Sequence, residues 1–100
     1  PTKAAHPEVA YLWKEETRRG FMFKLPPGFQ GKLYAPAPDL RAVVVSGEIR
    51  YQAPATKRAE ALPPGSYFGS TKAALHQVVC ASSGACVLYV RAGHGVRFVP

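Results

Sequence analysis

Residues 24–47 read KLPPGFQGKLYAPAPDLRAVVVSG, and residues 62–80, LPPGSYFGSTKAALHQVVC, follow the same pattern. Both stretches contain Pro-Pro-Gly near their start. Proline fixes φ at the first position of a turn, and glycine adopts the positive φ that other residues resist. Each turn leads into a β-rich segment, the strongest of which is LRAVVVSGEIRY at residues 40–51. The two stretches therefore predict two turn-plus-strand units of one β-architecture.

Short strands separated by turn residues account for the rest of the chain. Val9, Tyr11 and Trp13 alternate and are expected on one face of a strand, and Gly31 is expected to mark a bulge or bend. We expect about nine strands, at residues 8–13, 21–25, 29–34, 40–51, 59–62, 66–69, 75–80, 85–91 and 96–99. Such spacing is typical of an all-β sandwich or barrel. Residues 1–7 are interpreted as a tail or linker and residues 8–100 as a single domain.

The composition favours a folded domain and argues against nucleic acid or a membrane as its partner. Hydrophobic residues make up 47% of the chain, and no apolar run approaches the ~18 residues of a membrane span. The net charge is +7, yet the basic residues are scattered. No groove-entering helix or stacking motif is visible. We interpret the basic residues as a solvated surface, and the alternative is that they bind an anionic ligand. We expect neither nucleic acid nor a membrane as partner. Because the chain begins at Pro1 without a hydrophobic leader, we expect a mature form, a trimmed chain or an excised domain.

In their spacing, the two Pro-Pro-Gly stretches resemble the two motifs of the cupin superfamily. The first motif has a glycine, two histidines, a glutamate and a glycine, and these positions hold Gly28, Tyr34, Pro36, Leu40 and Gly47. The second has a glycine, a Pro-x-Gly, a histidine and an asparagine, and these positions hold Gly65, Thr71, Ala73, His76 and Cys80. The resemblance implies an all-β fold, the cupin jelly-roll barrel or double-stranded β-helix.

The resemblance extends to a narrower group. The segments AYLW, KLPPGF, RAVVVSG, LPPGSYFGS, HQVVC and CVLYVR resemble the second half of an uncharacterised bacterial bicupin family of unknown function. The likeness covers residues 9–99 and is most specific in PPGSYFGSTKAALHQVVC. It implies no established reaction. It implies that the domain pairs with a second cupin domain or forms a homodimer.

The usual metal-ligand positions predict that no metal cofactor binds. First-row metals require several nitrogen or oxygen donors in a fixed geometry. His76 supplies one donor, Pro36 and Leu40 supply none, and the phenol of Tyr34 ionises only near pH ~10. His6 and His94 fall outside the motif positions. We therefore expect a degenerate metal site.

Two alternatives remain for the barrel interior. In the first, Tyr34 fills the space left by the missing ligands and hydrogen-bonds to His76, which closes the pocket. In the second, an open pocket binds a small ligand, and His76 with Tyr34 serves as the acid–base pair of an enzyme or as part of a ligand sensor. The expected lining consists of Tyr34, His76, Phe23, Phe68, Tyr89 and Arg41.

Other polar residues near these positions are assigned more modest roles. Asp39 is the nearest candidate to orient His76. The sequence does not determine to which side of the strand its carboxylate points. Ser66, Ser70 and Thr71 are interpreted as turn residues beside glycine. Arg41 is interpreted either as an anion contact at the pocket mouth or as a structural cation that bonds loop carbonyls or Asp39.

Cys80 and Cys86 flank the loop-like stretch ASSGA, and both recur in the resembled family. Five intervening residues can bring the two Cα atoms within the ~4.4–6.8 Å that a disulfide needs. The alternatives are two buried thiols, or one cysteine on each layer of the barrel. A disulfide would favour an oxidising compartment, such as the bacterial periplasm, over the cytoplasm.

Both faces of the strand at residues 40–51 are largely apolar, so its outer side requires cover. We expect a second barrel, as a homodimer partner or a second cupin domain, with Val9, Tyr11 and Trp13 contributing part of the cover. The sequence therefore predicts a degenerate, metal-free cupin domain that is a structural or small-molecule-binding module. The alternative is an enzyme or sensor built on His76 and Tyr34.

Overall fold

The computed structural model describes residues 7–35, 40–53, 58–71, 73–93 and 95–99, in which all regular structure is β. Ten strands lie within these ranges: β1 (Glu8–Lys14), β2 (Arg19–Leu25), β3 (Gln30–Ala35), β4 (Leu40–Ser46), β5 (Ile49–Gln52), β6 (Glu60–Leu62), β7 (Tyr67–Ser70), β8 (Ala74–Cys80), β9 (Cys86–Ala92) and β10 (Arg97–Val99). The described residues form no helix that is long and apolar enough to cross a membrane.

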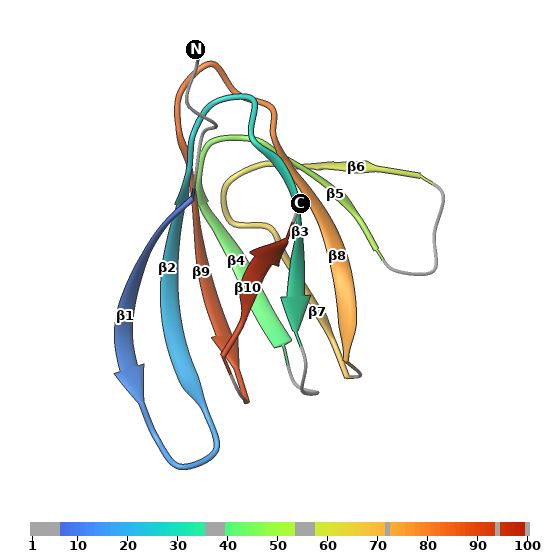
Figure 1. Cartoon of the computed structure of the whole chain (residues 1–100). Helices are drawn as coiled ribbons and strands as arrows, with labels where there is room; N and C mark the ends of the chain where they lie inside the picture. The colour runs from blue at the N-terminus through green and yellow to red at the C-terminus, as the bar shows by residue number, and fades with distance from the viewer. Residues whose placement is uncertain (1–6, 36–39, 54–57, 72, 94, 100) are drawn as a thin grey trace.

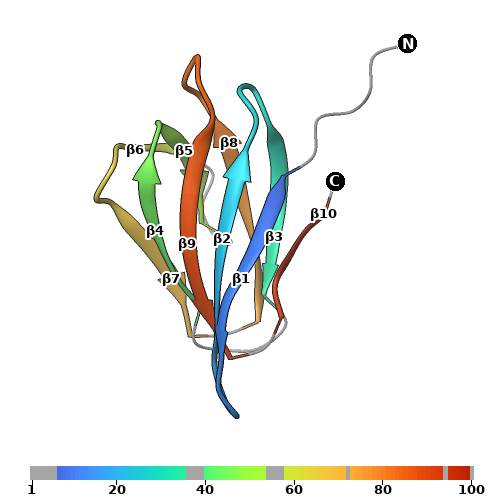
Figure 2. The ribbon, with the colours of Figure 1, turned by 90° about the vertical axis from the view of Figure 1, so that its left-hand side faces the viewer.

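The strands form two antiparallel sheets that face each other. The first sheet has the order β1-β2-β9-β4-β7, and the second has the order β10-β3-β8-β5-β6. Figure 1 shows the strands of both sheets, and in Figure 2 the first sheet lies in front of the second. Consecutive strands belong to different sheets except for the pairs β1 with β2 and β5 with β6, so the chain passes repeatedly from one layer to the other. This confirms the predicted all-β jelly roll.

The apolar run at residues 40–51 forms two strands rather than one interrupted strand. β4 belongs to the first sheet and β5 to the second, and Gly47 lies between them with φ of 82°. Gly28 and Gly65 also have positive φ, at 78° and 90°. These are the three glycines kept at the cupin motif positions, and each occupies a conformation that is costly for any other residue.

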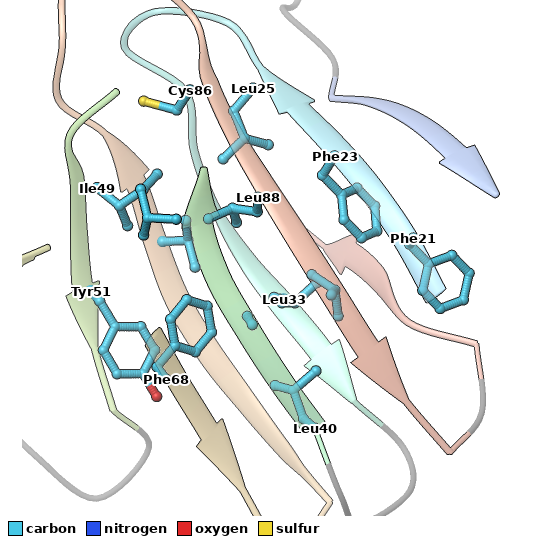
Figure 3. Packing of buried hydrophobic residues seen from close by; sticks show 14 of the residues in the cluster. Phe21, Phe23, Leu25, Leu33, Leu40, Ile49, Tyr51, Phe68, Cys86 and Leu88 are labelled. Atoms are coloured by element: carbon cyan, nitrogen blue, oxygen red, sulfur yellow. The ribbon is translucent and has the colours of Figure 1, made fainter. Parts of the chain in front are cut away.

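Alternation along the strands buries one face of each sheet. Along β4, Leu40, Ala42 and Val44 are buried, whereas Val43 and Val45 are 38% and 48% exposed. The buried side chains of both sheets meet in one core (Figure 3). The core residues are Phe21, Phe23, Leu25, Leu33, Ala35, Leu40, Ala42, Val44, Ile49, Tyr51, Phe68, Val78, Cys80, Cys86, Leu88, Val90 and Ala92.

Two predictions of local structure were wrong. Gly31 lies in a regular pairing of β3 with β8, and its missing side chain leaves room for the ring of Phe29. The irregularity is instead in β1, where the register shifts between Tyr11 and Trp13. As a result, Trp13 does not share a face with Tyr11, and its indole lies against the backbone of Gly20.

Candidate functional site

His76 is the only charged or polar residue among the fully buried side chains of the described chain. It lies in the middle of β8 and faces the core, because Ala74–Cys80 alternates with His76, Val78 and Cys80 buried. Its cross-strand neighbour on β3 is Leu33. A polar ring in such surroundings costs stability unless its nitrogens find hydrogen-bond partners.

Both ring nitrogens of His76 have such partners. The Tyr51 hydroxyl lies 2.7 Å from Nδ1, and the Ser70 hydroxyl lies 3.2 Å from Nε2. A neutral imidazole has one donor and one acceptor nitrogen, so either tautomer of His76 can form both hydrogen bonds. Tyr51 donates to Nδ1 while Nε2–H donates to Ser70, or Nδ1–H donates to Tyr51 while Ser70 donates to Nε2. The three side chains therefore form a hydrogen-bonded polar cluster inside the barrel.

Aromatic rings enclose this cluster. Tyr51 stacks on Phe68 with ring centroids 4.2 Å apart, and Figure 3 shows these two rings side by side. The centroid of the His76 ring lies 5.7 Å from each of them. Contacts of this kind fix ring orientation as well as bury apolar area. The end of the barrel around His76 is therefore filled by side chains.

The same burial keeps both titratable groups neutral. Burial lowers the pKa of His76 below its ordinary value of 6.5. Burial, and to a smaller extent the charge of Glu60, raises the pKa of Tyr51 above its ordinary value of 10.0. A low dielectric disfavours the charged form of each group. A neutral phenol and a neutral imidazole near pH 7 are compatible with the 2.7 Å hydrogen bond between them.

Tyr34 does not contact His76, which corrects the predicted pair. Within β3, Leu33 and Ala35 are buried, and Tyr34 points to the opposite side of the sheet. There it lies beside Leu75, which is 44% exposed. The residue that closes the barrel on His76 is Tyr51, which pairs with Val78 two positions along β8.

Of the other residues predicted to line the pocket, two face the core and two lie on the outer face of the first sheet. Phe68 and Phe23 are buried in the core, Phe68 beside His76 and Phe23 against Phe98. Tyr89 lies on the outer face of the first sheet and accepts a hydrogen bond from the Trp13 indole at 2.9 Å. Arg41 is also on that outer face and donates from Nη1 to the carbonyl oxygen of Leu40 at 2.9 Å. Tyr89 and Arg41 therefore do not line the interior.

The residues at the cupin ligand positions do not fit a metal. Leu40 is buried and has no donor atom, Tyr34 points outward, and both nitrogens of His76 are already engaged. Across the ranges that the structure describes, no three residues of the types His, Cys, Asp and Glu lie close enough to hold an ion. The predictions for Pro36, Asp39, His6 and His94 concern positions outside the described residues.

Cys80 and Cys86 are joined as a disulfide, with their Cα atoms 5.8 Å apart. The bond links the end of β8 in the second sheet to the start of β9 in the first, and both residues are buried. A Cβ on Gly47 would lie 2.7 Å from Sγ of Cys86, so this glycine also makes room for the bridge.

Sequence reasoning missed Tyr51 and Ser70. The alternation of Ile49 and Tyr51 was a usable signal, since both side chains face the core in β5. Ser70 was interpreted as a turn residue, but it is the last residue of β7 and pairs with Leu40. Its position beside His76 depends on how β7 and β8 are placed in different sheets, which no local pattern encodes.

Comparisons with known proteins agree with this fold. A family model described as DUF4437, a domain of unknown function, matches residues 1–97. No curated protein matches the chain.

Several solved structures are similar in fold. KdgF from Halomonas sp. is 16% identical, with 89% of this chain and 80% of that chain covered and a TM-score of 0.74. An RmlC-like cupin from Shewanella frigidimarina is 17% identical, with 88% and 77% covered and a TM-score of 0.74. An uncharacterized protein with a double-stranded β-helix domain from Klebsiella pneumoniae is 15% identical, with 100% and 89% covered and a TM-score of 0.77. At these identities the likeness establishes the cupin fold alone.

Proposed function

We propose that this chain, which belongs to the DUF4437 family of domains of unknown function, is a metal-free cupin module with a structural role, and that it pairs with a second barrel. The observation that carries the proposal is the Tyr51–His76–Ser70 cluster, in which both imidazole nitrogens are used within the protein. A histidine that held a metal or exchanged protons with a substrate would present one nitrogen to the ligand.

The surroundings of His76 support the structural role. Its neighbours Leu33, Phe68 and Tyr51 pack directly around the imidazole. An enzyme built on Tyr34 and His76 has no support in this geometry, since the two side chains lie on opposite faces of the second sheet.

The pairing surface is proposed on the outer face of the first sheet. The strand registers place Met22, Tyr89, Val43 and Tyr67 next to one another on four neighbouring strands. Within this row Val43 is 38% and Tyr67 is 77% exposed. A contiguous apolar row on a soluble surface is typical of an interaction site. We assign the row to a second copy of the chain, because an isologous two-fold contact lets the same apolar row cover itself.

Light scattering tests the pairing. The Tyr67→Lys variant places a charge in the row, and Tyr11→Lys is its matched control, because Tyr11 is also 77% exposed but points away from the row. We expect the unaltered chain and Tyr11→Lys to have the mass of a dimer at micromolar concentration, and Tyr67→Lys to have the mass of a monomer. A monomeric mass for the unaltered chain would refute the pairing and leave the metal-free interior to be judged separately.

A further inference from the structure

A groove lies at the β10 edge of the second sheet, away from the apolar row on the first sheet. Tyr34, Gly95, Val96 and Arg97 line this groove, which has a volume of about 410 Å³, where the chain enters β10. Tyr34 and Arg97 are direct partners in the pairing of β3 with β10. Small-molecule sites are usually ~300–1,000 Å³ in volume, so the groove is large enough for a small organic ligand.

Two guanidinium groups border this groove. The Cζ atom of Arg97 lies 5.6 Å from the centroid of the Tyr34 ring, a cation–π contact that holds the guanidinium beside the aromatic wall. Nη1 of Arg19 would lie 3.9 Å from a Cβ atom on Gly95, an ordinary contact distance, so a second cation lies next to this lining residue. Within the described parts of the chain, neither Arg19 nor Arg97 has a carboxylate partner.

The chemistry of the lining selects the ligand. Guanidinium groups bind carboxylates through two parallel hydrogen bonds, and the Tyr34 ring with the Val96 side chain offers an apolar surface for a flat body. The net charge of +7 raises the local concentration of anions around the protein. A cationic ligand would be repelled by the two arginines.

We infer that the groove bordered by Tyr34, Arg97 and Arg19 binds a small aromatic carboxylate. The ring of the ligand contacts Tyr34 and Val96, and its carboxylate groups bond to the two guanidinium groups. The site lies on the outer face of the second sheet, whereas the proposed pairing uses the outer face of the first. Ligand binding here is therefore independent of the metal-free interior and of dimer formation.

Phthalate, which has two carboxylates on one benzene ring, is the probe. Its binding is followed by amide chemical shifts in an NMR titration at constant ionic strength, with 1,2-benzenedimethanol as the neutral analogue. We expect saturable shifts around residues 95–97 with phthalate and none with the analogue. Removing one charge-assisted contact weakens binding about tenfold or more, so Arg97→Gln and Arg19→Gln should each do so.

Matched variants separate a site from a general charge effect. Arg50→Gln removes the same charge from an exposed position on the second sheet outside the groove, and should change the affinity less than about twofold. Tyr34→Phe keeps the ring and should bind as the unaltered chain does, whereas Tyr34→Leu should weaken binding. Circular dichroism confirms that each variant is folded. Equal weakening by Arg50→Gln and Arg97→Gln, or no saturable shift at all, would overturn the inference.

Discussion

The hydroxyl of Tyr51 lies 2.7 Å from Nδ1 of His76, in the part of the barrel where both side chains are almost completely buried. Tyr51 comes from β5 and His76 from β8, and the two strands pair so that Tyr51 and His76 are diagonal neighbours. This contact and the one from Ser70 satisfy the only fully buried polar side chain of the described residues. They tie the imidazole of His76 into the core.

Loss of the Tyr51 hydroxyl is expected to destabilise the fold. Tyr51→Phe keeps the stacked ring but leaves Nδ1 of His76 without its partner, which costs about 1–3 kcal/mol of unfolding free energy. Tyr11→Phe is the control, because Tyr11 is 77% exposed and lies outside the proposed pairing surface. Urea denaturation measures both. Equal stability of Tyr51→Phe and Tyr11→Phe would contradict a structural role for the hydrogen bond.

Stability is expected to depend on pH through His76. Because burial lowers the pKa of His76 in the folded state, the unfolded chain takes up a proton first as the pH falls below its ordinary value of 6.5. The free energy of unfolding should therefore decrease from pH 6.5 downward and level off below the folded-state pKa. Denaturation of the unaltered chain and of His76→Gln across this range measures the effect. The variant should lack this part of the pH dependence, and identical profiles would argue against it.

Any side chain at Gly47 is expected to destabilise the fold. An alanine at φ of 82° costs about 1–2 kcal/mol from the backbone alone, and its Cβ would also lie 2.7 Å from Sγ of Cys86. Gly28→Ala separates these causes, because Gly28 has φ of 78° but open space around it. We expect thermal stability to fall most for Gly47→Ala, less for Gly28→Ala and least for Gly84→Ala, a position with open space and no positive φ. A Gly47→Ala variant as stable as Gly84→Ala would be inconsistent with this turn.

The Cys80–Cys86 bridge is expected to contribute ~2 kcal/mol, because it closes a short loop in the unfolded chain. Thiol titration of unfolded, unreduced protein should find no free thiol, and adding a reductant should lower the melting temperature. The double variant with Cys80→Ala and Cys86→Ala should melt like the reduced protein and be insensitive to the reductant. Two free thiols in the unreduced protein would contradict the bridge.

Much of the fold could be predicted because its signals are local. The three glycines with positive φ and the alternation of Leu40, Ala42 and Val44 are properties of short segments. The division of residues 40–51 between two sheets was harder, because the β-branched residues on both sides of Gly47 favour extended backbone equally well.

The site was less predictable because its contacts are not local. Tyr34 and Tyr51 look equally suitable as partners for His76 in the sequence, and strand alternation decides between them only when the register with β8 is known. The register shift at Leu12 similarly turned Trp13 toward Tyr89, which no alternation pattern could reveal.

The most direct test of the metal-free interior is the metal content of purified, tag-free protein, measured by mass spectrometry together with thermal shifts in Zn²⁺, Mn²⁺ and Ni²⁺. A ligand that binds only the folded state raises its stability as RT ln(1 + [L]/Kd). We expect far less than one metal per chain and no shift with any of the three ions, because His76 is already bonded to Tyr51 and Ser70. One tightly held metal per chain, with a stabilising shift, would contradict the proposed function.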